Sequence, residues 1–294
     1  MSPRPSLRAL RAFAEVCRAG SVAPAARALG VSPSAVSHLL HELERTLGVA
    51  LFAGRQAAPP LSEAGQRLCL GLGSAFDTIE AAVAELVRRD GEVRVSLPYA
   101  FSSFWLVPRL ERLRTARPGT HLLLATETRR VDLATEPYDC AIRRGNGDFP
   151  GLEATVLFRE RLVVVVNPRL LAEAAGDLAR LPRIAARTRA DDWPPALAAL
   201  GLPLEAPATV TLETRVLTVP AALAGLGAAM AERRFVEDLV AAGMLALAAP
   251  GWPGVELGTE FYFVARTERL RDRHVRGFRD WLVEEARGGG GVPR

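Results

Sequence analysis

The feature that most constrains this chain is a regular repeat of apolar residues between positions 69 and 86. Their spacing alternates between three and four residues, in the order Cys69, Leu72, Phe76, Ile79, Val83 and Leu86. Such a repeat is typical of a coiled-coil seam, which needs a second helix to cover it. We therefore expect a long helix from Ser62 to about Arg89, with residues 65–89 as a linker. It should pair with the same helix of a second chain through Leu72, Phe76, Ile79, Val83 and Leu86. A helix that lies on its own domain is the alternative.

Three shorter helical patterns come before this segment. A serine that can cap a helix stands directly before each of them, at Ser6, Ser21 and Ser32. Gly20 and Gly30 can take the positive φ that ends a helix, and Pro33 suits the first position of the third helix. The spacing thus predicts three helices joined by tight turns.

The third predicted helix has two distinct faces. Its inward face carries Val36, Leu39, Leu40, Leu43 and Leu47, and its other face carries Ser34, Ser37, His38, His41 and Arg45. Two helices joined by a glycine-containing turn, the second beginning with small hydroxyl residues, are typical of a helix-turn-helix, whose second helix enters the major groove of DNA. A three-helix packing unit with a solvated polar face is the alternative.

The residues after the third helix predict a β wing. Leu51 and Phe52 form a short apolar strand, residues 54–60 are rich in turn formers, and Leu61 begins a return strand. Arg55 would lie at the tip of this wing. Residues 1–64 are therefore expected to form a winged helix-turn-helix domain.

At Asp90 the pattern changes to strands that alternate with helices, which predicts α/β units with covered sheets. The expected strands are Val93–Leu97, Leu122–Ala125, Cys140–Ile142, Leu162–Val166, Val210–Leu212, Ala228–Met230 and Phe261–Ala265. A segment of this length suits two lobes, with crossings near 160–167 and 258–264. We expect lobe I at 90–162 and 264–287, lobe II at 163–263, and a flexible tail at 288–294.

Composition excludes several protein classes. The 294 residues are 49% hydrophobic and 24% charged, which suits a folded chain, and no segment is long and apolar enough to span a membrane. The N-terminus does not resemble a secretory signal, so we expect a cytoplasmic protein. Cys17, Cys69 and Cys140 are too dispersed for a disulfide framework or a zinc site, and we interpret them as buried apolar residues.

The net charge is +4, and all 37 basic residues are arginine. Residues 1–64 hold seven arginines and four glutamates, so most of the excess lies in the predicted DNA-binding segment. A positive charge of this size permits a polyanionic partner without identifying one.

With these elements assigned, the sequence resembles the LysR-type transcriptional regulators, and within them the branch typified by the glycine-cleavage regulator. The match runs from Leu10 to Phe52, including A-G-S-V-A-P-A-A-R-A-L-G-V-S-P-S-A-V-S-H, and continues in L-S-E-A-G at 61–65. W-L-V-P-R-L at 105–110, Y-D-C-A-I-R-R-G at 138–145 and A-G-L-G at 224–227 extend it through the second half. The resemblance implies a DNA-binding regulator with a two-lobed effector domain of the periplasmic-binding-protein type.

The sequence departs from the family pattern at two places. Family members commonly carry arginines where this chain has Gly54 and Ala57, with Arg55 displaced by one position, so phosphate contact by the wing is in doubt. A serine or threonine usually stands where this chain has Ala100. Ser102 or Ser103 can substitute for it, or the ligand differs.

For DNA binding, the helix starts at Ser21 and Ser32 are expected to contact phosphates, because exposed amides at helix N-termini favour anions. Base reading is assigned to the start of the third helix, at Pro33, Ser34, Ser37 and His38, with His41 on the same face. Since small hydroxyls read bases weakly, operator spacing and DNA bending should supply most of the specificity. The alternative is that His38 and His41 are ordinary solvent-exposed residues that do not contact DNA.

For effector binding, the resemblance implies a cleft between the lobes that takes an anion or an amino-acid-like ligand. The candidate residues are Phe101, Ser102 and Ser103 at one helix start, Thr214 at another, Thr126 at a strand end, Arg143, and Tyr262 on the returning strand. Arg143 can instead pair with Asp139 or Glu127, and Tyr262 can instead belong to the core.

No catalytic or phosphate-binding motif appears, so an enzyme is not expected. A transport receptor would need a signal peptide. A ligand-independent or redox-sensing regulator is a third alternative, although Cys140 alone cannot form a disulfide within the effector domain. The expected partners are a double-stranded DNA operator, a small-molecule effector and RNA polymerase. We also expect the chain to form a homodimer or a homotetramer. No metal or cofactor is expected.

Overall fold

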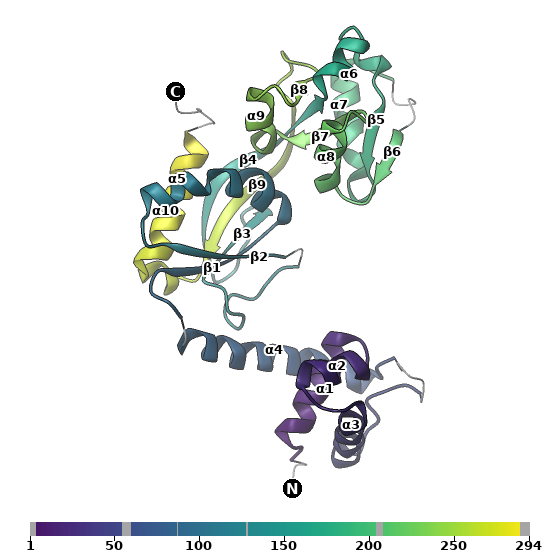
Figure 1. The fold of residues 1–294 in the computed structure, drawn as a ribbon, viewed down its shortest axis with the longest axis vertical. Helices are drawn as coiled ribbons and strands as arrows, with labels where there is room; N and C mark the ends of the chain where they lie inside the picture. The colour runs from purple at the N-terminus through teal and green to yellow at the C-terminus, as the bar shows by residue number, and fades with distance from the viewer. Residues whose placement is uncertain (1–3, 55–59, 87, 128, 204–207, 289–294) are drawn as a thin grey trace. The chain divides into compact units, whose positions relative to one another are not determined.

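The structure, a computed structural model, describes residues 4–54, 60–86, 88–127, 129–203 and 208–288. The chain divides into two compact units. One comprises Met1–Arg88 with Ala134–Pro137, and the other comprises Arg89–Leu133 with Tyr138–Arg294. Figure 1 shows the fold of the chain, and each unit has its own core of buried apolar side chains.

The first unit contains α1 (Leu7–Ala19), α2 (Val22–Leu29), α3 (Pro33–Leu47) and α4 (Glu63–Leu86). The predicted caps of α1 and α3 are confirmed, because Ser6 Oγ accepts the Ala9 N–H and Ser32 Oγ accepts the Ala35 N–H, each at 3.2 Å. Ser21 precedes α2 as predicted but makes no side-chain capping bond. Glycines in the left-handed conformation follow all three helices, at Gly20, Gly30 and Gly48.

The core of the first unit confirms the predicted inward face of α3. Val36, Leu40 and Leu43 are buried with residues of α1 and α2, and Leu39 and Leu47 pack partly buried against the same core. The wing is confirmed by an antiparallel bridge between Phe52 and Leu61. The predicted wing tip, Arg55, lies outside the described residues, as does Ala57.

The predicted seam of α4 falls into two parts. Cys69 and Leu72 pack partly buried against the core of the first unit, and Phe76 is only 9% exposed. Ile79, Val83 and Leu86 are 50%, 57% and 87% exposed. The first half of the helix therefore lies on its own unit, as the alternative interpretation expected, and the second half leaves its apolar residues uncovered.

The second unit is built on a mixed sheet with the strand order β2-β1-β3-β9-β4-β7-β5-β6, with β8 paired to β4. The strands are β1 (Glu92–Leu97), β2 (His121–Thr126), β3 (Cys140–Gly145), β4 (Glu153–Val166), β5 (Arg183–Ala186), β6 (Ala208–Leu212), β7 (Ala228–Glu232), β8 (Ala246–Leu247) and β9 (Val255–Ala265). All seven predicted strands are confirmed. β5 and β8 were not predicted, because their apolar runs are too short to stand out.

Two long strands connect the two lobes of this unit. β4 and β9 pair antiparallel from Glu153 opposite Ala265 to Leu162 opposite Val255, with irregular register between Arg159 and Arg161. β3 extends the sheet from β9 on one side, and β7 and β5 extend it from β4 on the other. Figure 1 shows the two lobes gathered at opposite ends of these strands. The predicted lobe boundaries at 162–163 and 263–264 lie within them.

Helices pack on both faces of the sheet in the second lobe and on one face in the first. The α-helices are α5 (Leu110–Ala116), α6 (Pro168–Glu173), α7 (Trp193–Leu200), α8 (Thr218–Leu223), α9 (Arg233–Ala241) and α10 (Arg273–Arg287). Shorter helical turns are η1 (Phe101–Leu106), η2 (Val107–Arg109), η3 (Leu178–Arg180), η4 (Arg187–Asp192), η5 (Arg215–Leu217) and η6 (Arg269–Arg271). Within the described ranges, no helix combines the length and apolar character needed to cross a membrane. Of the predicted tail, residues 289–294 lie outside the described residues.

Packing of α4 on the wing explains a glycine in the L-S-E-A-G motif. A Cβ added at Gly65 would overlap the carbonyl oxygen of Leu51, whereas one added at Gly71 in the same helix would meet nothing within 4 Å. Only a residue without a side chain lets the helix approach the backbone so closely.

We predict that Gly65→Ala lowers the free energy of unfolding of the first unit by on the order of 1–3 kcal/mol, because the backbone must shift to admit the methyl group. Gly71→Ala is the matched control and should raise it by about 0.5–1 kcal/mol through helix propensity. Chemical denaturation followed by circular dichroism measures both. Equal stability of the two variants would show that the close approach does not matter.

Candidate functional site

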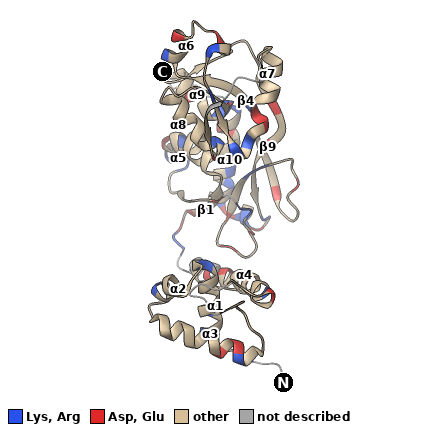
Figure 2. Ribbon diagram, turned by 90° about the vertical axis from the view of Figure 1, so that its right-hand side faces the viewer, with Lys and Arg blue, Asp and Glu red and all other residues tan. Residues whose placement is uncertain are grey.

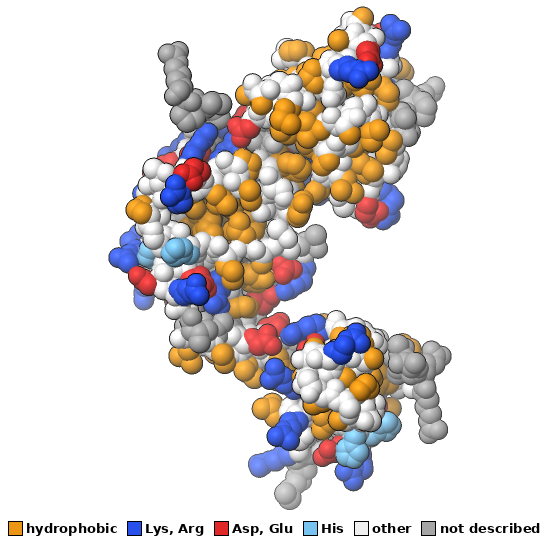
Figure 3. Space-filling view, viewed as in Figure 1, with side chains coloured by type: hydrophobic (Ala, Val, Ile, Leu, Met, Phe, Trp, Pro, Cys, Tyr) orange, Lys and Arg blue, Asp and Glu red, His pale blue; other side chains and the backbone are white. Residues whose placement is uncertain are grey.

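The first candidate surface is the polar face of α3. Pro33, Ser34, His38 and His41 are exposed, and Ser37 is half-buried. Figure 3 shows histidine side chains on the surface of this unit. The opposite side of α3 is packed in the core of the first unit. The core thus fixes the position of the helix, and its polar face stays exposed to solvent.

Local hydrogen bonds fix part of this face. Ser32 Oγ and Ser34 Oγ lie 2.9 Å apart, Ser37 Oγ donates to the Pro33 carbonyl at 3.0 Å, and His41 Nδ1 lies 2.7 Å from the Ser37 carbonyl. These bonds orient the side chains along one side of α3. A hydroxyl that already donates to the backbone can still accept a hydrogen bond from a base or donate to it after a small rotation.

The second candidate site is a cavity of about 620 Å³ in the second unit. Residues of both lobes line it. They come from the β1–η1 connection (Pro98, Tyr99, Ala100, Phe104), β3 (Arg143, Arg144), β4 (Glu160), η4 (Thr188, Arg189), the start of η5 (Thr214, Arg215), and the region of β7 and α9 (Ala231, Glu232, Phe235), among others. A volume of this size suits a small organic ligand.

Of the effector residues predicted from the sequence, Arg143 and Thr214 line this cavity, together with Ala100. Thr214 directly precedes η5, as predicted. The Arg143 guanidinium donates to the Ser96 carbonyl at 3.0 Å and to Ser96 Oγ at 2.8 Å. These bonds hold the Arg143 guanidinium against β1, and the alternative pairing with Asp139 or Glu127 stays a prediction.

The prediction that a helix starts at Ser102 and Ser103 is wrong. Helical structure begins at Tyr99, so both serines lie inside the helical segment, and the Ser102 N–H already donates to the Pro98 carbonyl at 3.0 Å. Phe101 and Ser102 are buried in the lobe, and Phe101 packs against Trp105 and Phe158. The helix starts earlier because Pro98 ends β1 and is followed at once by residues that continue as a helix.

Thr126 and Tyr262 also lie away from the cavity lining. Thr126 is exposed at the end of β2. Tyr262 is 6% exposed, packs edge-on against Phe149 and donates its hydroxyl to Glu260. Neither these two residues nor Phe101, Ser102 and Ser103, all within the described part of the chain, line the cavity.

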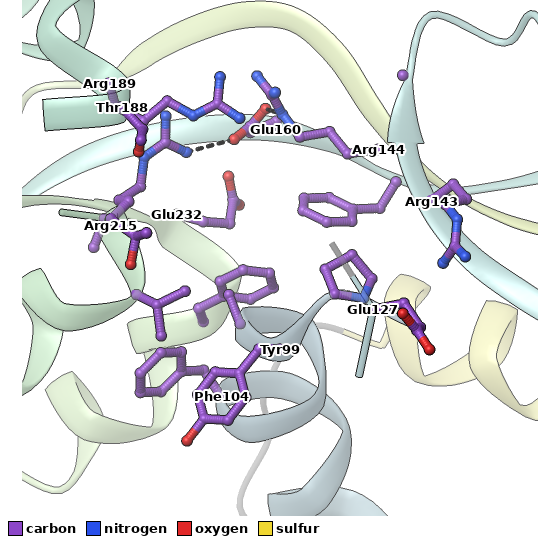
Figure 4. A pocket seen from close by; sticks show the side chains of 18 of the residues that line it. Tyr99, Phe104, Glu127, Arg143, Arg144, Glu160, Thr188, Arg189, Arg215 and Glu232 are labelled. Carbon is purple, nitrogen blue, oxygen red and sulfur yellow. Dashed lines mark hydrogen bonds and ion pairs between the residues drawn. The ribbon is translucent and has the colours of Figure 1, made fainter. Parts of the chain in front are cut away.

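The most buried charge in the cavity is Glu160 of β4, which is 1% exposed. Its carboxylate accepts hydrogen bonds from Arg215 at 2.7 Å, from Thr259 Oγ at 2.6 Å and from Arg144 Nε. Figure 4 shows the side chains of Arg144, Arg189 and Arg215 directed toward it. Burial acts to raise the pKa of Glu160, but the bonds from Thr259 and Arg144 and the charges of Arg144 and Arg215 outweigh it and lower the pKa.

Arg215 ties this group to a second carboxylate. It donates to both oxygens of Asp192, at 2.7 and 2.6 Å. A bidentate pair of this kind fixes the plane of the guanidinium. Figure 2 shows acidic and basic positions close together around β4 and β9.

Glu232, at the end of β7, has the opposite electrostatic environment. It is 3% exposed, accepts the backbone N–H groups of Arg161 at 2.7 Å and Arg234 at 3.2 Å, and points into the space beside Glu160 (Figure 4). Burial raises the pKa of Glu232 to about 8, so the side chain is mainly an uncharged carboxylic acid at neutral pH.

The sequence reasoning missed Glu160, Glu232, Arg189 and Arg215. A signal existed for the two acids, because each is the single carboxylate in a short stretch of otherwise apolar or arginine residues, V-L-F-R-E-R-L-V-V-V-V within β4 and A-A-M-A-E in β7. Arg215 directly follows Thr214, which was selected. Arg189 stands in an irregular polar stretch that carries no such signal.

Comparison with known proteins assigns a family to each of the two regions that hold a candidate site. The family model of the bacterial regulatory helix-turn-helix protein, lysR family, matches residues 7–66, and that of the LysR substrate binding domain matches residues 88–287. The chain belongs to the LysR family of transcriptional regulators. Such regulators bind DNA and small-molecule effectors and form oligomers, and the similar proteins are named as regulators, not as enzymes.

Relatives in this family match along nearly the whole chain. The transcriptional activator AmpR of Pseudomonas aeruginosa is 35% identical over 97% of this chain and 99% of its own. The glycine cleavage system transcriptional activator of Escherichia coli K12 is 31% identical over 97% of this chain and 96% of its own. The family resemblance found in the sequence is thereby confirmed.

Solved structures of LysR regulators share the fold. The alignment with CrgA of Neisseria meningitidis includes 96% of this chain and 99% of the CrgA chain, at 24% identity and a TM-score of 0.53. The alignment with the effector domain of AmpR of Pseudomonas aeruginosa includes 68% of this chain and 96% of the AmpR domain, at 30% identity and a TM-score of 0.54. The predicted fold class, a helix-turn-helix followed by a two-lobed α/β effector domain, is confirmed.

The raised pKa of Glu232 predicts a pH effect on the stability of the effector domain. The folded chain holds this proton up to about pH 8, whereas the unfolded chain releases it near 4.5, so the folded state binds more protons between these values. The contribution of Glu232 to the free energy of unfolding should therefore fall as pH rises through this window, by at most about 1.4 kcal/mol per pH unit.

Denaturant titrations from pH 5 to about pH 8 of the wild type and Glu232→Gln check this sign. The stability of the wild type relative to the variant should decline with rising pH. Glu173→Gln, which changes an exposed carboxylate paired with Arg169, is the control and should show no such decline. Parallel curves for wild type and Glu232→Gln would contradict the prediction.

Proposed function

We propose that this chain regulates transcription from an operator in double-stranded DNA, which it binds as a homodimer. A small effector, carboxylate or amino-acid-like, binds in the cavity of the second unit and modulates operator binding or transcription activation. The observation that supports this most strongly is the charged cavity lined by both lobes, in a LysR chain whose α3 presents an exposed polar face. The site of action is chromosomal DNA in the cytoplasm.

The proposed DNA contacts follow the exposed start of α3. Pro33, Ser34, Ser37 and His38 read bases in the major groove, with His41 further along the same face. The amides at the helix starts after Ser21 and Ser32 bind phosphates. Arg55, in the predicted wing, completes the set.

The proposed dimer forms through the uncovered half of α4. Ile79, Val83 and Leu86 are the exposed members of the repeat, and covering each would add about 1.5–3 kcal/mol of apolar burial at most. Leu72 and Phe76, which pack within the first unit, support the helix that carries this seam. Two such dimers in a homotetramer, and contact with RNA polymerase at the promoter, complete the proposal.

We predict that the double variant Ile79→Glu, Val83→Glu abolishes the dimer and with it operator binding, because charges cannot be buried in a coiled-coil seam. Sedimentation of the full chain and gel shift on an operator selected from random duplexes measure the two effects. Leu70→Glu is the control, since Leu70 is 77% exposed on the same helix but outside the repeat. An intact dimer in the double variant would refute the seam.

We predict that Ser34→Ala weakens binding to the selected operator by on the order of 1–3 kcal/mol and leaves binding to unrelated DNA nearly unchanged. The reason is that a base contact discriminates between sequences, whereas a phosphate contact does not. Titrations on both duplexes at fixed salt measure the difference. Equal losses on the two duplexes would assign Ser34 to the phosphate backbone.

A further inference from the structure

The charges of the cavity do not balance at its polar end. Three guanidinium groups, those of Arg144, Arg189 and Arg215, surround the carboxylate of Glu160 (Figure 4). Asp192 supplies one further negative charge through its bidentate pair with Arg215. Three positive charges thus face two negative ones.

Arg189 is the cation that remains uncompensated. Within the described residues it makes no hydrogen bond and no ion pair, although it lines the cavity beside Glu160. Partial burial is the main cause that lowers the pKa of the Arg189 guanidinium, the positive charges of Arg144 and Arg215 lower it further, and the carboxylates of Glu160 and Asp192 act in the opposite direction. An anionic group placed here would relieve the repulsion between the guanidinium groups.

The same end of the cavity offers nothing to a ligand cation. The carboxylate oxygens of Glu160 already accept from Arg144, Arg215 and Thr259, and Glu232 is uncharged at neutral pH and accepts two backbone N–H groups. An ammonium group would therefore meet arginines and no available buried carboxylate. The cavity should therefore bind an organic acid, which has no ammonium group, more tightly than an amino acid of similar size.

The cavity also has apolar lining. Phe104, Phe235 and Phe261 contribute aromatic rings to it, with ring centroids of Phe235 and Phe261 5.4 Å apart and those of Phe104 and Phe235 6.5 Å apart. Rings arranged in this way can pack against a flat or branched hydrocarbon body.

We propose that the effector is a small organic anion without an ammonium group. Its carboxylate or phosphate group binds Arg189 between Arg144 and Arg215, and its apolar body lies on Phe104, Phe235 and Phe261. This inference rests on the proposed effector function and narrows it, because carboxylates and amino acids are no longer equivalent. Arg189, contributed by η4, is the residue that discriminates between them.

The test uses the full-length chain and four probes with one hydrocarbon skeleton: 3-phenylpropionate, 2-phenylethyl phosphate, L-phenylalanine and the neutral 3-phenylpropanamide. Thermal unfolding is followed at millimolar probe concentrations, since a ligand that binds the folded state raises the unfolding temperature. The two anions should raise it more than the amide, and L-phenylalanine should raise it least. The stronger of the two anions identifies the preferred charged group.

Arg189→Gln should weaken the binding of the two anions by about tenfold or more, because one charge-assisted contact is lost. The affinity for the neutral amide should stay the same. Arg187→Gln is the matched control. Arg187 stands two residues away, is 69% exposed and pairs with Glu213 outside the cavity, so its variant should bind like the wild type.

The inference is overturned if neither anion stabilises the protein, if the amide or L-phenylalanine stabilises it as well as the anions do, or if Arg189→Gln binds the anions like the wild type. Operator binding by gel shift is measured in parallel. Normal operator binding together with preferential stabilisation by L-phenylalanine would leave the proposed function intact and reject only the anionic effector without an ammonium group. Absence of operator binding by the wild type would count against the proposed function itself.

Discussion

The antiparallel pairing of β4 with β9 is the contact on which the effector domain depends. The two strands pair over ten residues of β4, and each also pairs with a strand of one lobe, β3 beside β9 and β7 beside β4. Glu160 lies in β4 at the irregular register, where its carboxylate turns into the cavity. A buried carboxylate is costly unless it is paired, and breaking such a pair typically costs about 3–5 kcal/mol. Arg144 from β3 and Arg215 from η5 satisfy it from two sides, so a single charge ties together elements of both lobes.

The linker helix depends on a different balance. Its first half is fixed by apolar contacts and by a close approach of Gly65 to the wing, and its second half presents the same apolar repeat with no cover in its own unit. The alternative interpretation of the repeat therefore describes the first half of the helix, and the seam with a second chain stays a prediction for the second half. A sequence repeat gives the spacing of apolar residues but not where a domain stops covering them, because coverage depends on the path of the remaining chain.

Local signals in the sequence were sufficient for most of the fold. The caps at Ser6 and Ser32, the terminal glycines and the seven longer strands all depend on residues close together in the chain, and the structure contains them. The strands β5 and β8 are too short for such signals. The two lobes were predicted from the length of the alternating segment, and the family resemblance added their arrangement as a periplasmic-binding-protein type of domain.

The cavity could be predicted only in part, because its chemistry arises from long-range pairs. Arg143 and Thr214 were found from strand and helix ends, whereas Ser102 and Ser103 were misplaced by a helix that starts three residues earlier. Glu160 meets Arg144 and Arg215 from positions 16 and 55 residues away along the chain, and no spacing rule joins them. Most of the residues chosen from the sequence carry hydroxyl groups and only Arg143 is charged, whereas the structure also places Arg144, Arg189 and Arg215 in the cavity.

The position of this charged group gives a ligand the means to act on the domain as a whole. A ligand can shift a protein between two arrangements only by as much as its affinity for them differs. An anion that bound a single lobe would bind equally well whatever the other lobe did. The groups around Glu160 come from β3, β4, η4 and η5, on both sides of the paired strands. The affinity of an anion placed among them would therefore depend on how these elements are spaced, and this dependence would couple occupancy of the cavity to the arrangement of the lobes.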